Sequence, residues 1–268
     1  MFEARNLSVA YGKRTILHGL DFAARPGQIT AVIGPNGSGK TTLLKALTGE
    51  IPISGDVRID DVPLQRFRPH ELALRRAVLA QETQFAFPFT VAEVVALGIA
   101  AGLPLPGEAE RQRRIADALE AVDLAGFAGR SVHALSGGER QRAQLARVLC
   151  QIWEPEDASG ARWLFLDEPV SSLDIRHQLV IMDLAANYAR RGGGVIAVMH
   201  DLNLTAMYAD RITLMSGGHV AASGTPDAVF GDETLAEVFG CPLKVGQVPA
   251  NRRFVLPQSA GTTLSMPS

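Results

Sequence analysis

The sequence has little cysteine and no excess of basic residues. Its two cysteines, Cys150 and Cys241, lie far apart and outside any C-x-x-C spacing. This pattern predicts free thiols in a reducing cytosol. The 26 lysine and arginine residues are outnumbered by 28 aspartate and glutamate residues, which gives a net charge of −2. Because no positive excess is available to neutralise phosphates, the composition argues against a general nucleic-acid binder.

Long apolar runs are also missing. No run of 18 or more apolar residues exists, and the nearest candidate, 85–107, is interrupted by Glu93 and several prolines. The N-terminus carries Glu3 and has no apolar core of signal-peptide length. These absences predict a soluble chain, which can still have a membrane partner. The sequence also lacks a heptad stretch, an internal repeat and a long linker, so we expect one folded unit.

Strand and helix patterns alternate through most of the chain. Short alternating strands fill the first 35 residues, and the apolar runs 163–167, 194–200 and 211–215 are separated by helical patterns. Strands separated by helices predict a mostly parallel sheet. Residues 68–145 are mainly helical and are interpreted as an insertion. The fold prediction is therefore α/β, with an N-terminal antiparallel β subdomain and an inserted α-helical subdomain. The last residues, 257–268, lack an apolar pattern and are predicted to be disordered.

A glycine-rich segment, "GPNGSGKTT", lies between a predicted strand and a predicted helix. It matches the P-loop pattern G-x-x-x-x-G-K-[ST]. In such a loop the backbone N–H groups surround phosphate, Lys40 reaches the β- and γ-phosphates, and the Thr41 hydroxyl binds Mg²⁺. A plain glycine turn is the alternative interpretation. The predicted phosphate-binding residues are Gly34, Pro35, Asn36, Gly37, Ser38, Gly39, Lys40, Thr41 and Thr42.

Two acidic residues end the apolar run "WLFLDEP" at 163–169. A buried strand would bring Asp167 and Glu168 to its carboxyl end, which is where doubly wound sheets bind ligands. We expect Asp167 to hold Mg²⁺ and Glu168 to polarise an attacking water. A helix-capping acid is the alternative.

The stretch "ALSGGERQRAQLARVL" at 134–149 begins a helix in an unusual way. Ser136 and Glu139 form a capping-box pattern, yet Gly137 and Gly138 occupy the first turn. Glycine weakens a helix by roughly 1 kcal/mol per residue. It also leaves backbone N–H groups open to an anion at the positive helix end. The segment therefore predicts a second contact with phosphate.

With these three motifs in this order, the sequence resembles the nucleotide-binding subunits of ATP-binding-cassette (ABC) transporters. The resemblance covers about residues 2–240, with Glu139 where that family more usually has glutamine. It implies an ABC-type P-loop NTPase domain over 1–240, with the helical subdomain at about 84–150 and a partly disordered extension over 241–268. It also implies hydrolysis of ATP with Mg²⁺ by a head-to-tail homodimer. Ser136, Gly137 and Gly138 of one subunit then contact the ATP bound by the P-loop of the other.

The same resemblance assigns four further residues. Tyr11 matches the aromatic residue that stacks on adenine, and Gln81 matches the glutamine that contacts Mg²⁺ and the attacking water. Asp174 ends "SSLD", which resembles the D-loop at the nucleotide site, and His200 matches the switch histidine that contacts the γ-phosphate. The alternatives are a half-buried strand tyrosine, a surface glutamine and a core histidine. The catalytic set is thus Glu168, His200 and Gln81.

The remaining histidines have no ligand-like spacing. They are predicted to be ordinary surface or packing residues: His18, His70, His133, His177 and His219.

Two segments indicate which kind of ABC protein this chain resembles. Phe85, Phe87 and Phe89 alternate in a segment that resembles importers of iron-siderophores, cobalamin and haem. The long connection 151–163, flanked by Trp153 and Trp163, resembles haem-importer ATPases. The core of the helical insertion and a neutral loop insertion are the respective alternatives.

This resemblance implies a place and partners for the subunit. It would lie at the cytoplasmic face of the inner membrane, bound to two permease subunits and only indirectly to a substrate-binding protein. Haem would not touch this subunit. Import of ferric siderophore or cobalamin, or a soluble ATPase of iron–sulfur cluster assembly, stays open at this point.

Overall fold

The computed structural model describes residues 1–81, 87–101, 107–248 and 253–260. A six-stranded sheet in the order β12-β11-β3-β10-β9-β6 forms its centre. These strands are β3 (Ile29–Ile33), β6 (Arg76–Leu79), β9 (Trp163–Asp167), β10 (Gly194–Val198), β11 (Arg211–Ser216) and β12 (His219–Gly224). All neighbouring pairs are parallel except β11 with β12.

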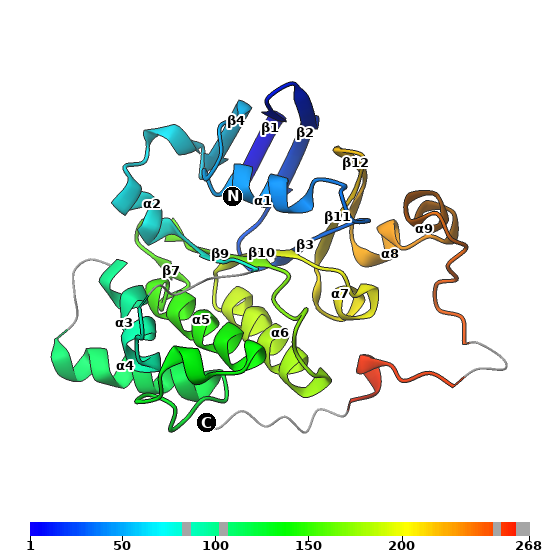
Figure 1. Ribbon diagram of the computed structural model, residues 1–268. Coiled ribbons are helices and arrows are strands. Elements are labelled where there is room, and N and C mark those ends of the chain that lie inside the picture. Colours follow the sequence, from blue (N-terminus) through cyan, green and yellow to red (C-terminus); the bar gives the residue numbers. More distant parts are fainter. Residues whose placement is uncertain (82–86, 102–106, 249–252, 261–268) are drawn as a thin grey trace.

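A second sheet is antiparallel and lies on one side of the central sheet (Figure 1). Its order is β2-β1-β4-β5, formed by β1 (Phe2–Tyr11), β2 (Arg14–Ala24), β4 (Ser54–Ile59) and β5 (Val62–Pro63). Helix α1 (Lys40–Leu47) lies between the two sheets. The predicted antiparallel β subdomain at the N-terminus is therefore confirmed.

Helices cover the opposite side of the central sheet (Figure 1). They are α3 (Val91–Ala101), α4 (Glu108–Ala121), α5 (Gly137–Gln151) and α6 (Ile175–Arg190). Shorter helices lie elsewhere: α2 (Pro69–Arg75), α7 (Leu202–Tyr208), α8 (Pro226–Val229) and α9 (Asp232–Phe239). None of the helices in the described ranges is long and apolar enough to cross a membrane.

The central strands are buried on both faces, which explains their continuous apolar sequences. In β9, Trp163 and Phe165 face the antiparallel sheet, and both rings form T-shaped pairs with Phe2 at centroid distances of 5.2 and 5.3 Å. Leu164 and Leu166 point the other way, into the core under α5 and α6. The strand thus contributes side chains to two hydrophobic cores, and this packing fixes the position of Asp167 at its carboxyl end.

Two segments differ from or refine the sequence-based expectation. The connection 151–163 forms a small hairpin of β7 (Glu156–Asp157) and β8 (Gly160–Ala161). Residues 257–259 were expected to lack structure, but they form a 3₁₀ turn that packs on α7, where the Gln258 amide donates to the Asn203 carbonyl at 3.1 Å. The predicted disorder is therefore wrong for this turn, while 261–268 lie outside the described residues.

The two cysteines are free, as predicted, and they differ sharply in environment. Cys150 is buried in α5, and burial raises the pKa of its thiol to about 12, whereas Cys241 is exposed. Because the thiolate is the reactive form, a disulfide reagent at about pH 8 is expected to modify Cys241 quickly and Cys150 only after denaturation. The absorbance of the thiolate that the reagent releases measures the number of modified cysteines over time, and Cys241→Ser serves as the control. Fast modification of both native thiols would contradict the burial of Cys150.

Candidate nucleotide-binding site

The P-loop joins β3 to α1 and depends on its glycines. Gly34, Gly37 and Gly39 all have positive φ angles, of 147°, 78° and 101°. A Cβ atom on Gly34 would also lie 2.2 Å from the Met215 carbonyl oxygen. Only glycine adopts this backbone path without strain. The loop therefore wraps tightly at the carboxyl end of β3, where the predicted phosphate-binding residues lie together.

Lys40 points back along this loop. Its Nζ atom donates to the carbonyl oxygens of Gly34 at 2.9 Å and Pro35 at 3.1 Å, and the residue is only 6% exposed. Burial lowers the pKa of the Lys40 ammonium group, while the carboxylates of Glu168 and Asp167 act in the opposite direction. A cation is thus held inside the loop at the position that the P-loop pattern predicts.

Asp167 and Thr41 face one another across the carboxyl ends of β9 and the first turn of α1. Thr41 Oγ1 lies 3.5 Å from Asp167 Oδ1, and Asp167 is 5% exposed. Burial raises the pKa of Asp167, and the charge of Glu168 acts in the same direction. A hydroxyl beside a buried carboxylate suits Mg²⁺, which takes one or two carboxylates and completes its ligands with water and phosphate. The residues present therefore fit the predicted ion.

Glu168 lies where three predicted catalytic residues meet. Gln81 Nε2 donates to one oxygen of its carboxylate at 2.8 Å, and His200 Nε2 lies 2.7 Å from the other. Its backbone has φ of 52°, a conformation uncommon for a residue other than glycine. Strained backbone of this kind concentrates at functional sites. A carboxylate accepts about four hydrogen bonds, so Glu168 keeps acceptor positions for a water molecule.

Tyr11 lies at the end of β1, where it pairs with Arg14 across the turn into β2. Its side chain is exposed, with a relative accessibility of 51%. An exposed ring face is what stacking on a base requires, so the predicted contact of Tyr11 with adenine is compatible with this position.

The segment 135–139 forms the start of α5 as its capping pattern predicts. Ser136 Oγ accepts from the Glu139 N–H at 3.3 Å, and the Glu139 carboxylate accepts from the Ser136 N–H at 2.7 Å. These backbone and side-chain hydrogen bonds lower the pKa of Glu139. Within the described residues, no hydrogen bond joins Ser136 to 34–42. A single chain thus does not connect the two predicted phosphate contacts.

The loop 168–174 contains contacts that the sequence analysis missed. The Gln141 amide of α5 donates to the carbonyl oxygens of Pro169 at 2.8 Å and Glu168 at 3.3 Å, and Ser172 Oγ donates to Gln141 Oε1 at 2.5 Å. Gln178 of α6 donates to Val170 and Leu173. The available signal was the spacing of Gln141, four residues after Gly137 and so on the same helix face.

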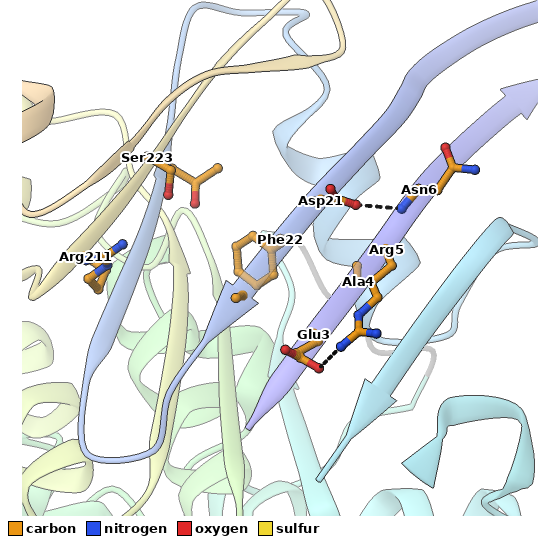
Figure 2. Close-up of a pocket in the computed structure, with 10 residues that line it drawn as sticks. Glu3, Ala4, Arg5, Asn6, Asp21, Phe22, Arg211 and Ser223 are labelled. Atoms are coloured by element: carbon orange, nitrogen blue, oxygen red, sulfur yellow. Dashed lines mark hydrogen bonds and ion pairs between the residues drawn. The ribbon is translucent and has the colours of Figure 1, made fainter. Parts of the chain in front are cut away.

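A separate hollow of about 530 Å³ lies between the antiparallel sheet and the β11–β12 edge (Figure 2). Two of its charged side chains pair with each other, Arg5 with Glu3 at 3.4 Å, and Asp21 accepts from the backbone N–H of Asn6 at 2.8 Å. Arg211 and Ser223 line its other wall. In the described part of the chain, the residues that line this hollow include neither the P-loop nor Asp167 and Glu168. This hollow is therefore not the nucleotide site.

Comparison with known proteins agrees with this geometry. A family model described as ABC transporter matches residues 17–171. The chain belongs to the ABC transporter family. Its predicted fold class and family resemblance are thereby confirmed, and as a member of this family it is an ATPase that binds ATP.

The curated relatives match this ABC protein over almost its whole length. A protein of Mesorhizobium japonicum named hemin import ATP-binding protein HmuV is 56% identical, covering 97% of this chain and 99% of the relative. A protein of the same name from a Jannaschia species is 53% identical, covering 98% and 96%.

Two solved structures extend the likeness to dimers. One is a dimeric bacterial ABC transporter cassette, with TM-score 0.75, 26% identity and coverage of 84% and 99% of the two chains. The other is a dimeric cassette in a post-hydrolysis state with ADP and phosphate, with TM-score 0.74, 25% identity and the same coverage.

Proposed function

We propose that this chain is the ATP-hydrolysing subunit of a haem importer. The observation that supports the cargo is the near full-length identity of 56% to a protein named for hemin import. The observation that supports hydrolysis is the Glu168 carboxylate held between Gln81 and His200 beside the P-loop. The site residues given above are part of this proposal.

In the proposed reaction, the P-loop and Lys40 bind the phosphates of ATP, and Tyr11 stacks on the adenine. The Thr41 hydroxyl and the Asp167 carboxylate would hold a Mg²⁺ ion, which when bound supplies positive charge next to the phosphates. Lys40 can move from its own loop carbonyls to a phosphate oxygen, since the ion pair replaces two neutral acceptors.

Hydrolysis itself depends on Glu168. One of its free acceptor positions takes a hydrogen bond from the attacking water and orients that oxygen toward the γ-phosphorus. The new bond forms between water oxygen and phosphorus, and the bond from phosphorus to the β–γ bridging oxygen breaks, which leaves ADP and phosphate. His200 and Gln81 hold the Glu168 carboxylate in place, and His200 is also assigned the contact with the γ-phosphate.

The site is completed by a second copy of the chain. Ser136, Gly137 and Gly138 of the partner subunit present the N-terminus of α5 to the γ-phosphate, with Asp174 nearby in the same interface. Dimeric cassettes among the solved relatives support this arrangement. Loss of phosphate after hydrolysis removes the shared anion, so the dimer can reopen.

The permease contact is proposed next to Gln81. Phe87 is 66% exposed and lies edge-on to Phe89, with ring centroids 6.1 Å apart. Leu97 of α3 adds a second exposed apolar side chain. Phe85, the third predicted aromatic residue, lies outside the described residues. Exposed apolar side chains that gather on one surface are typical of a protein contact, so we assign the permease contact to this part of the chain, and attachment there would make the subunit peripheral to the cytoplasmic face of the membrane.

The cargo and the partner are tested together. The chain is co-expressed with its candidate permease, purified through a tag on the chain alone, and reconstituted in vesicles with the substrate-binding protein. We expect the untagged permease to co-purify. We also expect ATP-dependent uptake of haem to exceed uptake of ferric siderophore and cobalamin by at least about 10-fold, which corresponds to a difference of about 1.4 kcal/mol in transition-state binding. Preferred uptake of either other cargo contradicts haem import, and absence of a co-purifying permease contradicts transport.

A further inference from the structure

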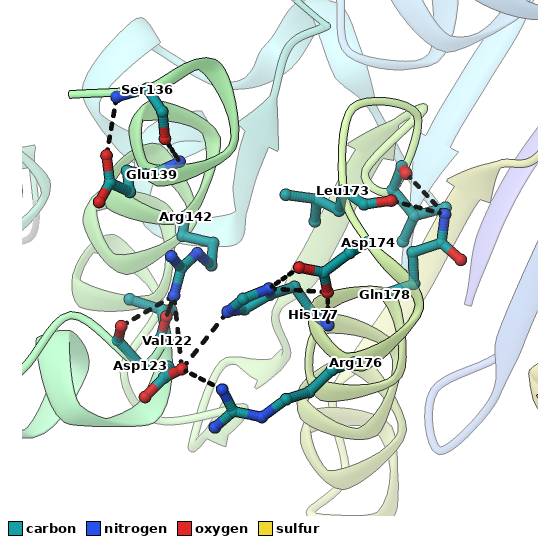
Figure 3. A network of polar contacts seen from close by, with 11 residues as sticks. Val122, Asp123, Ser136, Glu139, Arg142, Leu173, Asp174, Arg176, His177 and Gln178 are labelled. Carbon is teal, nitrogen blue, oxygen red and sulfur yellow. Dashed lines mark hydrogen bonds and ion pairs between the residues drawn. The ribbon is translucent and has the colours of Figure 1, made fainter. Parts of the chain in front are cut away.

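His177 lies between two carboxylates that belong to different parts of the chain (Figure 3). Its Nδ1 atom is 2.9 Å from both oxygens of Asp174, and its Nε2 atom is 3.4 Å from Asp123 Oδ2. Asp174 ends the loop 168–174 and caps α6, where it also accepts from the His177 N–H at 2.9 Å. The side chain of His177 is only 18% exposed. The prediction of an ordinary surface or packing residue did not include these two contacts.

Asp123 is itself held by the helix that carries Ser136. It follows α4 with φ of 58°, and Arg142 of α5 donates to its carbonyl oxygen at 2.8 Å and to that of Val122 at 3.0 Å. The Arg142 guanidinium is buried and also lies 3.8 Å from the Asp123 carboxylate, while Arg176 lies 3.1 Å from it. Asp123 thus cannot shift without disturbing Arg142 and hence α5.

The loop 168–174 is consequently tied to α5 at both ends. Gln141 holds its first residues through the carbonyl oxygens of Glu168 and Pro169. The next residue along the helix, Arg142, holds Asp123, which faces His177 and through it Asp174. The His177 N–H and ring also lower the pKa of Asp174, which favours its charged form beside the imidazole.

We propose that His177 is a positioning residue for ATP hydrolysis. By joining Asp174 to Asp123, it makes the loop that begins at Glu168 move together with the helix that begins after Ser136. Glu168 acts on the ATP bound by its own chain, and Ser136 contacts the ATP bound by the partner. These two residues then keep a fixed spacing when the dimer closes. The inference rests on the proposed function, because it assigns Glu168 and Ser136 the roles given above.

The test separates the two contacts of the imidazole ring. His177→Asn keeps a short amide near the position of Nδ1, and so keeps the contact with Asp174, but it cannot reach Asp123. We expect His177→Asn and Asp123→Asn each to lower kcat about 10-fold, while KM for ATP and the thermal midpoint stay close to wild type. The double variant is expected to lose no more than the more affected of the two single variants, because either change alone already removes the contact between His177 and Asp123. His70→Asn, at an exposed position of α2, is the matched control.

Three outcomes would overturn the proposed bridge from Asp174 through His177 to Asp123. The first is a kcat of His177→Asn within twofold of wild type, and the second is losses that multiply in the double variant. The third is a fall in thermal midpoint that accounts for the loss in kcat, which would show a merely structural role. Glu168→Gln is measured in parallel on the full chain with its permease. If that change leaves turnover intact, the proposed function fails; if it abolishes turnover while His177→Asn is fully active, only the bridge fails.

Discussion

Glu168→Gln is expected to lower ATP turnover by about 10²–10⁴-fold, the range that general-base catalysis contributes. The amide has nearly the same shape as the carboxylate, so the backbone at φ of 52° and the position between Gln81 and His200 are kept. What is lost is the negative charge that orients the water and accepts its proton. ATP binding should therefore persist while hydrolysis stops.

The second result expected of this change is a trapped dimer. Since ATP is no longer consumed, it stays between the two subunits, and light scattering with ATP and Mg²⁺ should report twice the mass measured without nucleotide. Glu154→Gln is the control, because the Glu154 carboxylate pairs with the exposed Arg191, at 3.3 Å, at the far end of α6. Turnover within threefold of wild type would show that another group activates the water.

The meeting of Gln81, Glu168 and His200, the proposed catalytic residues, was predictable because the pairing of parallel strands brings them together. In the central sheet, Leu79 pairs with Leu166, and Val198 pairs with Asp167. Gln81 and His200 each follow by two residues, so parallel pairing alone brings both to the end of β9 where Glu168 lies. Apolar runs that predict buried parallel strands therefore predict this meeting of side chains too.

The contacts around His177 could not be predicted in the same way. Asp123 and His177 lie on separate helical segments, and no strand register or helical periodicity relates their positions. Asp123 and Glu168 have positive φ angles of 58° and 52°. Neither residue is a glycine, so the sequence does not indicate these backbone conformations. Both backbone conformations are imposed by tertiary packing. The contact of Gln141 with the Pro169 carbonyl likewise depends on how α5 lies against the sheet.

Gly137 offers the sharpest test of the dimer, because a Cβ atom added there has open space around it in the part of its own subunit that the structure describes. A Cβ atom added to Gly137 has no neighbour within 4 Å, whereas one added to Gly138 lies 3.0 Å from Leu173. Gly137→Val should thus leave folding and ATP binding unchanged. In the proposed dimer, however, the valine lies where the γ-phosphate of the partner's ATP approaches the helix N-terminus.

We therefore expect Gly137→Val to lower turnover by at least about 10²-fold, comparable with the loss of one charge-stabilising donor in an active site. The nucleotide Kd of the chain should stay within twofold of wild type, and the variant combined with Glu168→Gln should no longer form the ATP-dependent dimer in light scattering. Gly129→Val is the matched control, since a Cβ atom on Gly129 likewise has no neighbour within 4 Å. If Gly137→Val hydrolysed ATP at the wild-type rate, the start of α5 would not contact the partner's phosphate, and the glycines in its first turn would need another explanation.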